Sequence, residues 1–152
     1  MTNGDHVFAV SSLVGRPREE VFTFFSDAAN LEQITPPQLR FRITSPVPVQ
    51  MGVGALIDYR LKLFGIPFGW KTRITAWEPG VCFVDEQLEG PYTKWVHTHK
   101  FRDRDGGTEV DDSVLFRLPL FPLGEIALPA VKLQLRYIFN YRSGRIKQLL
   151  GA

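Results

Sequence analysis

Two hydrophobic periodicities follow one another along this chain of 152 residues, and they restrict its fold more than any other feature. Apolar and polar residues alternate in a series of short segments, which is the pattern of strands with one buried face. Turn residues separate these segments, so neighbouring strands are expected to run antiparallel. The predicted strands are residues 5–14, 39–43, 54–64, 69–78 and 107–118, together with the two arms of a hairpin at 82–102.

A long helical period occurs only near the end of the chain. Residues 129–149 predict an amphipathic helix of about 31 Å with Pro129 in its first turn. Its apolar stripe consists of Leu128, Val131, Leu135, Ile138, Phe139, Ile146 and Leu149. The flanking basic residues, interpreted as a solvated face, include Lys132, Arg136, Arg142, Arg145 and Lys147. Because such a helix must bury its stripe, the sequence predicts an α+β fold in which a curved antiparallel sheet of about seven strands wraps around it.

Two short helices are predicted between the first and second strands. Pro17 suits the first turn of one helix, with Glu19 and Glu20 near its positive end. The other helix covers Ala28 to Ile34 and ends before Pro36. No repeat, low-complexity tract or linker interrupts the chain, so residues 1–152 are expected to form a single domain.

Composition argues against several classes of function. The net charge is only +2 and no nucleic-acid reader motif is present, so a nucleic-acid partner is not expected. The single cysteine, Cys82, allows neither an intrachain disulfide nor a cysteine-based zinc site. No signal peptide precedes Val7 and no apolar run approaches about 18 residues, so a cytoplasmic location is expected. The sequence leaves the oligomeric state open.

The hairpin at 82–102 carries the most informative side chains. Its second arm alternates, with Trp95, His97, His99 and Phe101 on one face and Lys94, Val96, Thr98 and Lys100 on the other. The second set is polar enough for water, so the first set should face the interior. Two imidazoles would then enter a largely apolar space, where buried polar groups need partners.

Partners for the imidazoles are available on the neighbouring strands. A three-residue turn at Gly90 would place Asp85 across from His97 and Gln87 across from Trp95, and Asp112 could contribute a second carboxylate. A carboxylate beside an imidazole is the arrangement that orients a general base. The face of the first arm stays open at this point, because Cys82, Val84 and Leu88 form an equally plausible inward set, which would turn Asp85 outward.

The spacing of His97 and His99 can also bind a metal. No third ligand has matching spacing, since Arg104 occupies the position where a His-x-His motif with a downstream glutamate would need that glutamate. Neither a metal nor a cofactor is therefore expected. No nucleophile motif, phosphate loop or paired-carboxylate motif indicates a defined reaction.

Strand parity places three turns rich in apolar residues at one end of the sheet. These are residues 64–69, 89–92 and 118–124. Apolar residues on turns either cap the core or mark contact with something else. The second interpretation predicts the rim of a pocket, for a lipophilic ligand or for transient membrane contact, formed by Phe64, Ile66, Phe68, Tyr92 and Phe121.

These features resemble a known superfamily. The order of elements, the phrase R-P-R-E-E-V-F-T-F-F at 16–25 and the terminal helix are similar to the START-like, helix-grip superfamily, also called SRPBCC or polyketide cyclase/dehydrase-like. The phrase G-P-Y-T-K-W-V-H-T-H-K-F at 90–101 resembles a signature of its coenzyme-Q-binding branch, with His99 where that branch has tryptophan. The fuller pattern resembles a bacterial group of ligand-binding members. The resemblance implies a cavity between the sheet and the long helix.

The resulting hypothesis is a non-catalytic protein that binds a small hydrophobic molecule with a polar group, for transport, sequestration or presentation. The expected apolar walls are Tyr59, Trp70, Ile74, Trp95, Phe101, Val114, Phe116, Leu135, Ile138 and Phe139. His97, His99, Gln87 and Asp112 are expected to orient the polar group.

Two other classes of function remain open. One is a cyclase- or dehydratase-like enzyme with His97 or His99 as general acid or base and Asp85 as the orienting carboxylate. The other is an interaction module, in which Leu133, Tyr137 and Tyr141 or the apolar turns bind a partner protein.

Overall fold

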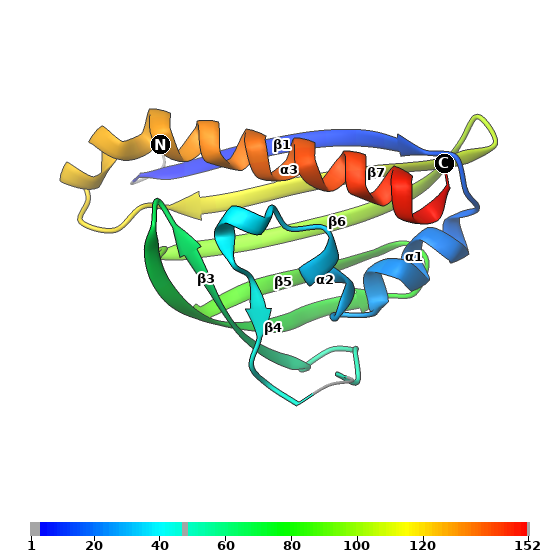
Figure 1. The fold of residues 1–152 in the computed structure, drawn as a ribbon, viewed down its shortest axis with the longest axis horizontal. Coiled ribbons are helices and arrows are strands. Elements are labelled where there is room, and N and C mark those ends of the chain that lie inside the picture. Colours follow the sequence, from blue (N-terminus) through cyan, green and yellow to red (C-terminus); the bar gives the residue numbers. More distant parts are fainter. Residues whose placement is uncertain (1–3, 47–48, 152) are drawn as a thin grey trace.

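The computed structural model describes residues 4–46 and 49–151 and contains one seven-stranded antiparallel sheet (Figure 1). The strands are β1 (Asp5–Val14), β2 (Arg42–Ile43), β3 (Leu56–Leu63), β4 (Ile66–Glu78), β5 (Cys82–Glu89), β6 (Lys94–Arg104) and β7 (Gly107–Arg117). They are arranged in the order β1-β7-β6-β5-β4-β3-β2, so each consecutive pair from β2 to β7 is joined by a neighbouring connection. The predicted antiparallel sheet is confirmed, and its two edges are β1 and β2.

The helices cover one side of this sheet. Helix α3 (Leu128–Leu150) runs along the sheet over β1 and β7, whereas α1 (Arg18–Ser26) packs on β6 and β7 near the C-terminal end of α3 and is followed by α2 (Asn30–Gln33) (Figure 1). Two short 3₁₀ turns, η1 (Pro37–Leu39) and η2 (Leu123–Ala127), precede β2 and α3. The helix predicted at 129–149 is confirmed with one further residue at each end, and so are the two short helices after the first strand.

Strand β4 begins at Ile66, three residues before the predicted start at 69. Proline lacks a backbone N–H and usually interrupts a paired strand. Pro67 is tolerated here because it pairs with Lys62 of β3 on one side, while β5 pairs with β4 only from Lys71 onward. The missing N–H therefore removes no hydrogen bond between β4 and β5.

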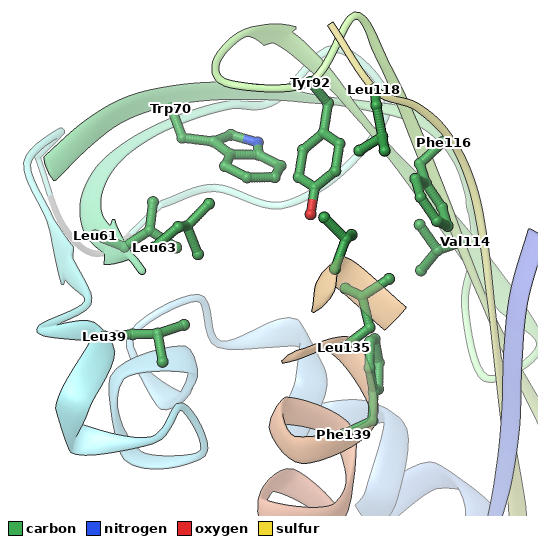
Figure 2. Close-up of a cluster of buried hydrophobic side chains, with 11 residues drawn as sticks. Leu39, Leu61, Leu63, Trp70, Tyr92, Val114, Phe116, Leu118, Leu135 and Phe139 are labelled. Carbon is green, nitrogen blue, oxygen red and sulfur yellow. The ribbon is translucent and has the colours of Figure 1, made fainter. Parts of the chain in front are cut away.

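The apolar interior consists of two clusters. The first lies between the sheet and the N-terminal half of α3 and contains Leu39, Leu61, Leu63, Trp70, Tyr92, Val114, Phe116, Leu118, Val131, Leu135 and Phe139 (Figure 2). The second lies under α1 and the C-terminal half of α3 and contains Val14, Val21, Phe22, Phe25, Ile34, Ile74, Phe83, Phe101, Val110 and Ile146. Among the described residues, no helix is long and apolar enough to cross a membrane.

Phe101 connects α1 to the sheet. Its side chain is only 2% exposed, and its ring centroid lies 5.2 Å from that of Phe22 and 5.4 Å from that of Phe25. Removing such a ring loses both its transfer free energy and the contacts around the cavity left behind. This contact therefore holds the helical segment against β6.

We expect Phe101→Ala to lower the free energy of unfolding by about 3–5 kcal/mol, measured by urea denaturation. Leu133→Ala is the matched control, because Leu133 is 63% exposed on α3 and should change stability by less than about 0.5 kcal/mol. Equal effects of the two substitutions would contradict the described packing of α1.

Candidate ligand-binding site

A cavity of ≈ 120 Å³ lies between the sheet, α3 and the segment from α1 to β3. Its aromatic and aliphatic walls include Tyr59, Trp70, Ile74, Trp95, Leu135, Ile138 and Phe139, with Phe25, Leu31, Leu39 and Met51 closing it from the connecting segment. Figure 2 shows part of this space, with Leu39, Leu61 and Leu63 opposite Leu135 and Phe139 of α3. The volume is of the order of the ~150 Å³ apolar cavity that accepts a benzene molecule.

The aromatic wall is built by cross-strand pairing. Tyr59 of β3 and Trp70 of β4 are directly opposite each other, and their rings stack with centroids 5.7 Å apart. The Trp95 ring packs edge-to-face on Trp70 at 5.2 Å. Neighbouring rings at these distances favour one another's orientation. Strand alternation thus places three large rings on the same inner face.

A cluster of four polar side chains lies beside this wall and is called the His–Asp cluster below: Asp85, His97, His99 and Asp112. His97 Nε2 donates to Asp112 Oδ1 at 2.8 Å, and His99 Nε2 donates to Asp85 Oδ2 at 2.7 Å. Both imidazoles are buried. These hydrogen bonds answer the question that the sequence raised, because each buried imidazole has a carboxylate partner.

The two imidazoles are stacked with ring centroids 3.7 Å apart, so a positive charge on one ring disfavours protonation of the other. Burial and the proximity of His99 lower the pKa of His97. Burial also opposes the charge on His99, but the nearby carboxylates of Asp112 and Asp85 outweigh it and raise its pKa. The cluster therefore favours protonation of His99 over protonation of His97.

Both carboxylates of the cluster favour their ionised form. Burial by itself would raise the pKa of Asp85 and Asp112. The hydrogen bonds and positive charge of the imidazoles more than offset this, and they lower the pKa of each carboxyl group below its ordinary value of 3.8. Asp112 faces both imidazoles, because its Oδ1 lies 2.8 Å from His97 Nε2 and 3.4 Å from His99 Nδ1.

Three members of the cluster could hold a metal by distance alone. One ligand atom each from Asp85, His97 and His99 lies within 4.8 Å of the others, so Asp85 is the third ligand that sequence spacing did not predict. The two rings, however, are inclined by only 25°. Their nitrogen lone pairs then lie in nearly parallel planes, whereas a tetrahedral metal needs them to converge on one point. The arrangement fits two hydrogen-bonded His–Asp pairs better than a metal centre.

The inward face of β5, which the sequence left open, carries Phe83 and Asp85. Phe83 is buried and stacks on His99 at 4.0 Å, while Asp85 lines the cavity and Leu88 is exposed. The expected pairing of Asp85 with His97 is present in the strand register. Asp85 nevertheless accepts its hydrogen bond from His99, because its Oδ2 lies 3.9 Å from His97 Nδ1, which is beyond hydrogen-bond distance.

Gln87 does not line the cavity, in contrast to the prediction. Its side-chain amide donates to the Tyr92 carbonyl at 2.7 Å and accepts from the Tyr92 N–H at 3.1 Å. Strand register predicted that Gln87 would face inward near Trp95, but not that the Gly90–Pro91 turn would need its amide. Gln87 therefore stabilises the hairpin turn.

Four further predicted wall or handle residues also lie off the cavity surface. Phe101 is covered by α1, and Val114 and Phe116 are completely buried in the first cluster, close to α3. Asp112 borders a second, smaller cavity of ≈ 70 Å³ on the β1 side of α3. Alternation identified their inward face correctly, but β6 and β7 are longer than the cavity, so only part of that face lines it.

The predicted pocket rim differs more from the structure than any other part of the site. Only Tyr92 lines the cavity; Phe64, Ile66 and Phe121 are exposed, and Phe68 packs against the first cluster. The turns after β3, β5 and β7 do share one end of the sheet (Figure 1). Parity predicts which turns lie together, but not how far the cavity extends toward them.

Arg142 is a charged site residue that the sequence interpretation missed, along with the apolar residues that close the cavity from the connecting segment. It lines both cavities, although it was assigned to the solvated flank of the helix. A signal was present, because Arg142 stands midway between Ile138 and Ile146 at steps of four residues, on the same helical face. The other flank residue Arg136 is exposed, as predicted.

Comparison with known proteins assigns the chain to a family. The model of the family described as polyketide cyclase / dehydrase and lipid transport matches residues 14–140. The chain belongs to this family. The match includes six of the seven strands and most of α3, so the START-like resemblance is confirmed at the level of the superfamily. A search of curated protein sequences gives no match.

Solved structures similar to this family member share its fold at low sequence identity. The Zhui aromatase/cyclase from a Streptomyces species has a TM-score of 0.75 and 13% identity, with 93% of this chain and 91% of that chain covered. A START superfamily protein from Mycobacterium smegmatis has a TM-score of 0.72 and 15% identity, with 95% and 99% covered. The ginseng major latex-like protein from Panax ginseng has a TM-score of 0.67 and 11% identity, with 95% and 97% covered.

The His–Asp cluster predicts an acid-sensitive fold. Because the pKa values of Asp85 and Asp112 are lowered on folding, their contribution is present above pH 3.8 and is lost as the pH falls below it. The raised pKa of His99 and the lowered pKa of His97 act in opposite directions near pH 6.5, so stability should change less there.

We expect the free energy of unfolding, measured by urea titration from pH 7 to pH 2, to decrease most steeply on the acid side for the wild type. Asp112→Asn should be less stable at pH 7 by about 3–5 kcal/mol and should show a shallower acid slope. Asp105→Asn, in an exposed turn, should keep the wild-type slope. A wild-type slope in the Asp112 variant would contradict the assigned role of this carboxylate.

Proposed function

We propose that this protein binds a small hydrophobic molecule carrying a polar group in the cavity between the sheet and α3. The observation that carries the proposal is a cavity with aromatic and aliphatic walls that also contains His97, His99 and Asp85. Ligand pockets combine a mostly apolar lining with a few placed polar groups in this way. The cavity volume limits the enclosed part of the ligand to about one or two rings.

The polar handle in this proposal is the free nitrogen of His97. Its Nε2–H is held by Asp112, and no described residue forms a hydrogen bond with its Nδ1. In the uncharged imidazole this nitrogen is an acceptor, so it could receive a hydrogen bond from a ligand hydroxyl or amide. The Tyr92 hydroxyl, which points from the sheet toward α3 in Figure 2, could serve a second polar atom. Tyr59, Trp70 and Trp95 would contact the ring.

Native mass spectrometry of the purified protein should detect a copurified small molecule, and calorimetric titration with 2-naphthol should detect binding. Ile138→Trp should fill the cavity from α3 and weaken 2-naphthol binding by about tenfold or more, because Ile138 lines it. Leu133→Trp, on the exposed face of the same helix, should bind as the wild type does. Binding that survives Ile138→Trp in a folded protein would place the ligand elsewhere.

A second candidate is an enzyme of the cyclase or dehydratase type, with His97 as general base. The observation that favours it is the hydrogen bond from His97 to the buried Asp112, because a carboxylate at one imidazole nitrogen orients the other toward a substrate. The lowered pKa of His97 keeps that nitrogen unprotonated at neutral pH. His99 suits this role less well, since its raised pKa favours the protonated form.

If a substrate is found, His97→Asn should reduce kcat by about 10²-fold or more, while leaving KM within a few-fold. The enzyme candidate is wrong if turnover persists after both His97 and His99 are replaced.

Other finer hypotheses stay predictions. The relation to the coenzyme-Q-binding branch depends on the phrase at 90–101 and on a site with His99 in place of tryptophan. An interaction surface would involve Leu133 and Tyr137, which are exposed on α3, although the Tyr137 hydroxyl donates to Gln38 at 3.0 Å. Transient membrane contact would involve the exposed apolar turns, and the cytoplasmic location belongs to the same group of predictions.

A further inference from the structure

Arg142 brings a guanidinium group to the wall of the cavity. It lies on α3 one turn after Phe139, and its guanidinium carbon is 5.0 Å from the centroid of the Phe139 ring. The same side chain lines the main cavity and the smaller one on the β1 side. Arg142 is half-buried and therefore stands between two hollow regions.

This guanidinium has no carboxylate in close contact among the described residues. Its Nε is buried without a hydrogen-bond acceptor, and none of the described carboxylates lies within the 4.0 Å of an ion pair with Arg142. Burial lowers the pKa of Arg142, although Asp112 and Asp85 partly offset this at longer range. A partly buried cation without a close anion costs free energy. A group that supplies negatively charged oxygen atoms would recover that cost.

The carboxylates near Arg142 are already engaged. Asp112 accepts from His97 at 2.8 Å and Asp85 accepts from His99 at 2.7 Å. The Trp70 Nε1–H is a further buried lining donor without a hydrogen bond, whereas His99 Nδ1 lies 3.4 Å from Asp112 Oδ1. Among the described lining residues, the donors Arg142 Nε–H and Trp70 Nε1–H thus lack acceptors, whereas His97 Nδ1 is an acceptor. A ligand that accepts hydrogen bonds would satisfy these two donors.

Resting on the proposed function, we infer that the ligand is a hydrophobic carboxylic acid bound as its anion, with the carboxylate at Arg142 and the apolar part against the aromatic wall. Guanidinium and carboxylate match in geometry and form charge-assisted hydrogen bonds that are about twice as strong as neutral ones. Arg142 is then the residue that determines specificity for an acid over a neutral molecule of the same shape. Its contact with Phe139 holds the guanidinium at the edge of the apolar space.

The test compares 2-naphthoate with 2-naphthamide, which share a ring system and differ in charge. Calorimetric titration of the wild type should give at least about tenfold tighter binding of the carboxylate than of the amide. Arg142→Gln should abolish this preference while still binding the amide, which shows that the cavity is intact. Arg136→Gln removes one positive charge from the exposed face of the same helix and should keep the preference. Arg142→Met, with a side chain suited to burial, serves as the second variant if Arg142→Gln does not fold.

The outcomes separate this inference from the proposed function. Equal affinity of the wild type for both compounds would overturn the acid specificity and leave hydrophobic binding intact. No binding of either compound, in a protein without a copurified molecule, would overturn both. A preference that persists in folded Arg142→Gln or Arg142→Met, or is lost equally in Arg136→Gln, would remove the assignment to Arg142.

Discussion

A seven-stranded antiparallel sheet has more inner surface than a single helix can cover, and the site follows from this mismatch. Strands about 4.8 Å apart make such a sheet roughly 29 Å wide, whereas a helix with its side chains is about 10 Å across. Helix α3 covers β1 and β7, and the segment from α1 to η1 covers much of the rest (Figure 1). The cavity lies where these two covers meet over β3 to β6.

The His–Asp cluster occupies the boundary between the two apolar clusters. His99 contacts Phe83 of the second cluster, whereas His97 is next to Trp95 and Phe139 at the first. Four ionisable groups in such a place are tolerated because each carboxylate has an imidazole at hydrogen-bond distance. This internal pairing leaves Arg142, a half-buried charge, without a carboxylate at ion-pair distance. Its guanidinium interacts with Asp85 and Asp112 at longer range, from the helix and not from the sheet.

Prediction from the sequence was most successful where a single hydrophobic periodicity determines the direction in which a side chain faces. Alternation placed Trp95, His97 and His99 on one inward face, and the helical stripe identified Leu135, Ile138 and Phe139 on the opposite side of the cavity. It was less successful where two elements compete for the same side chain. Gln87 was expected in the cavity, but the backbone of Tyr92 takes both ends of its amide. Phe101 was expected on the wall, but α1 covers it.

By itself, the sequence determined the order of the elements, the antiparallel sheet and the inward direction of the two histidines, since these follow from local periods of two and 3.6 residues. Only the tertiary structure decided which inward residues border empty space, which carboxylate each imidazole meets, and that Arg142 belongs to the cavity. These depend on how α3 lies across strands that are distant in the chain. A helical position is solvated or enclosed according to that packing, so the same charged residue could be read as a surface residue until the sheet beneath it was known.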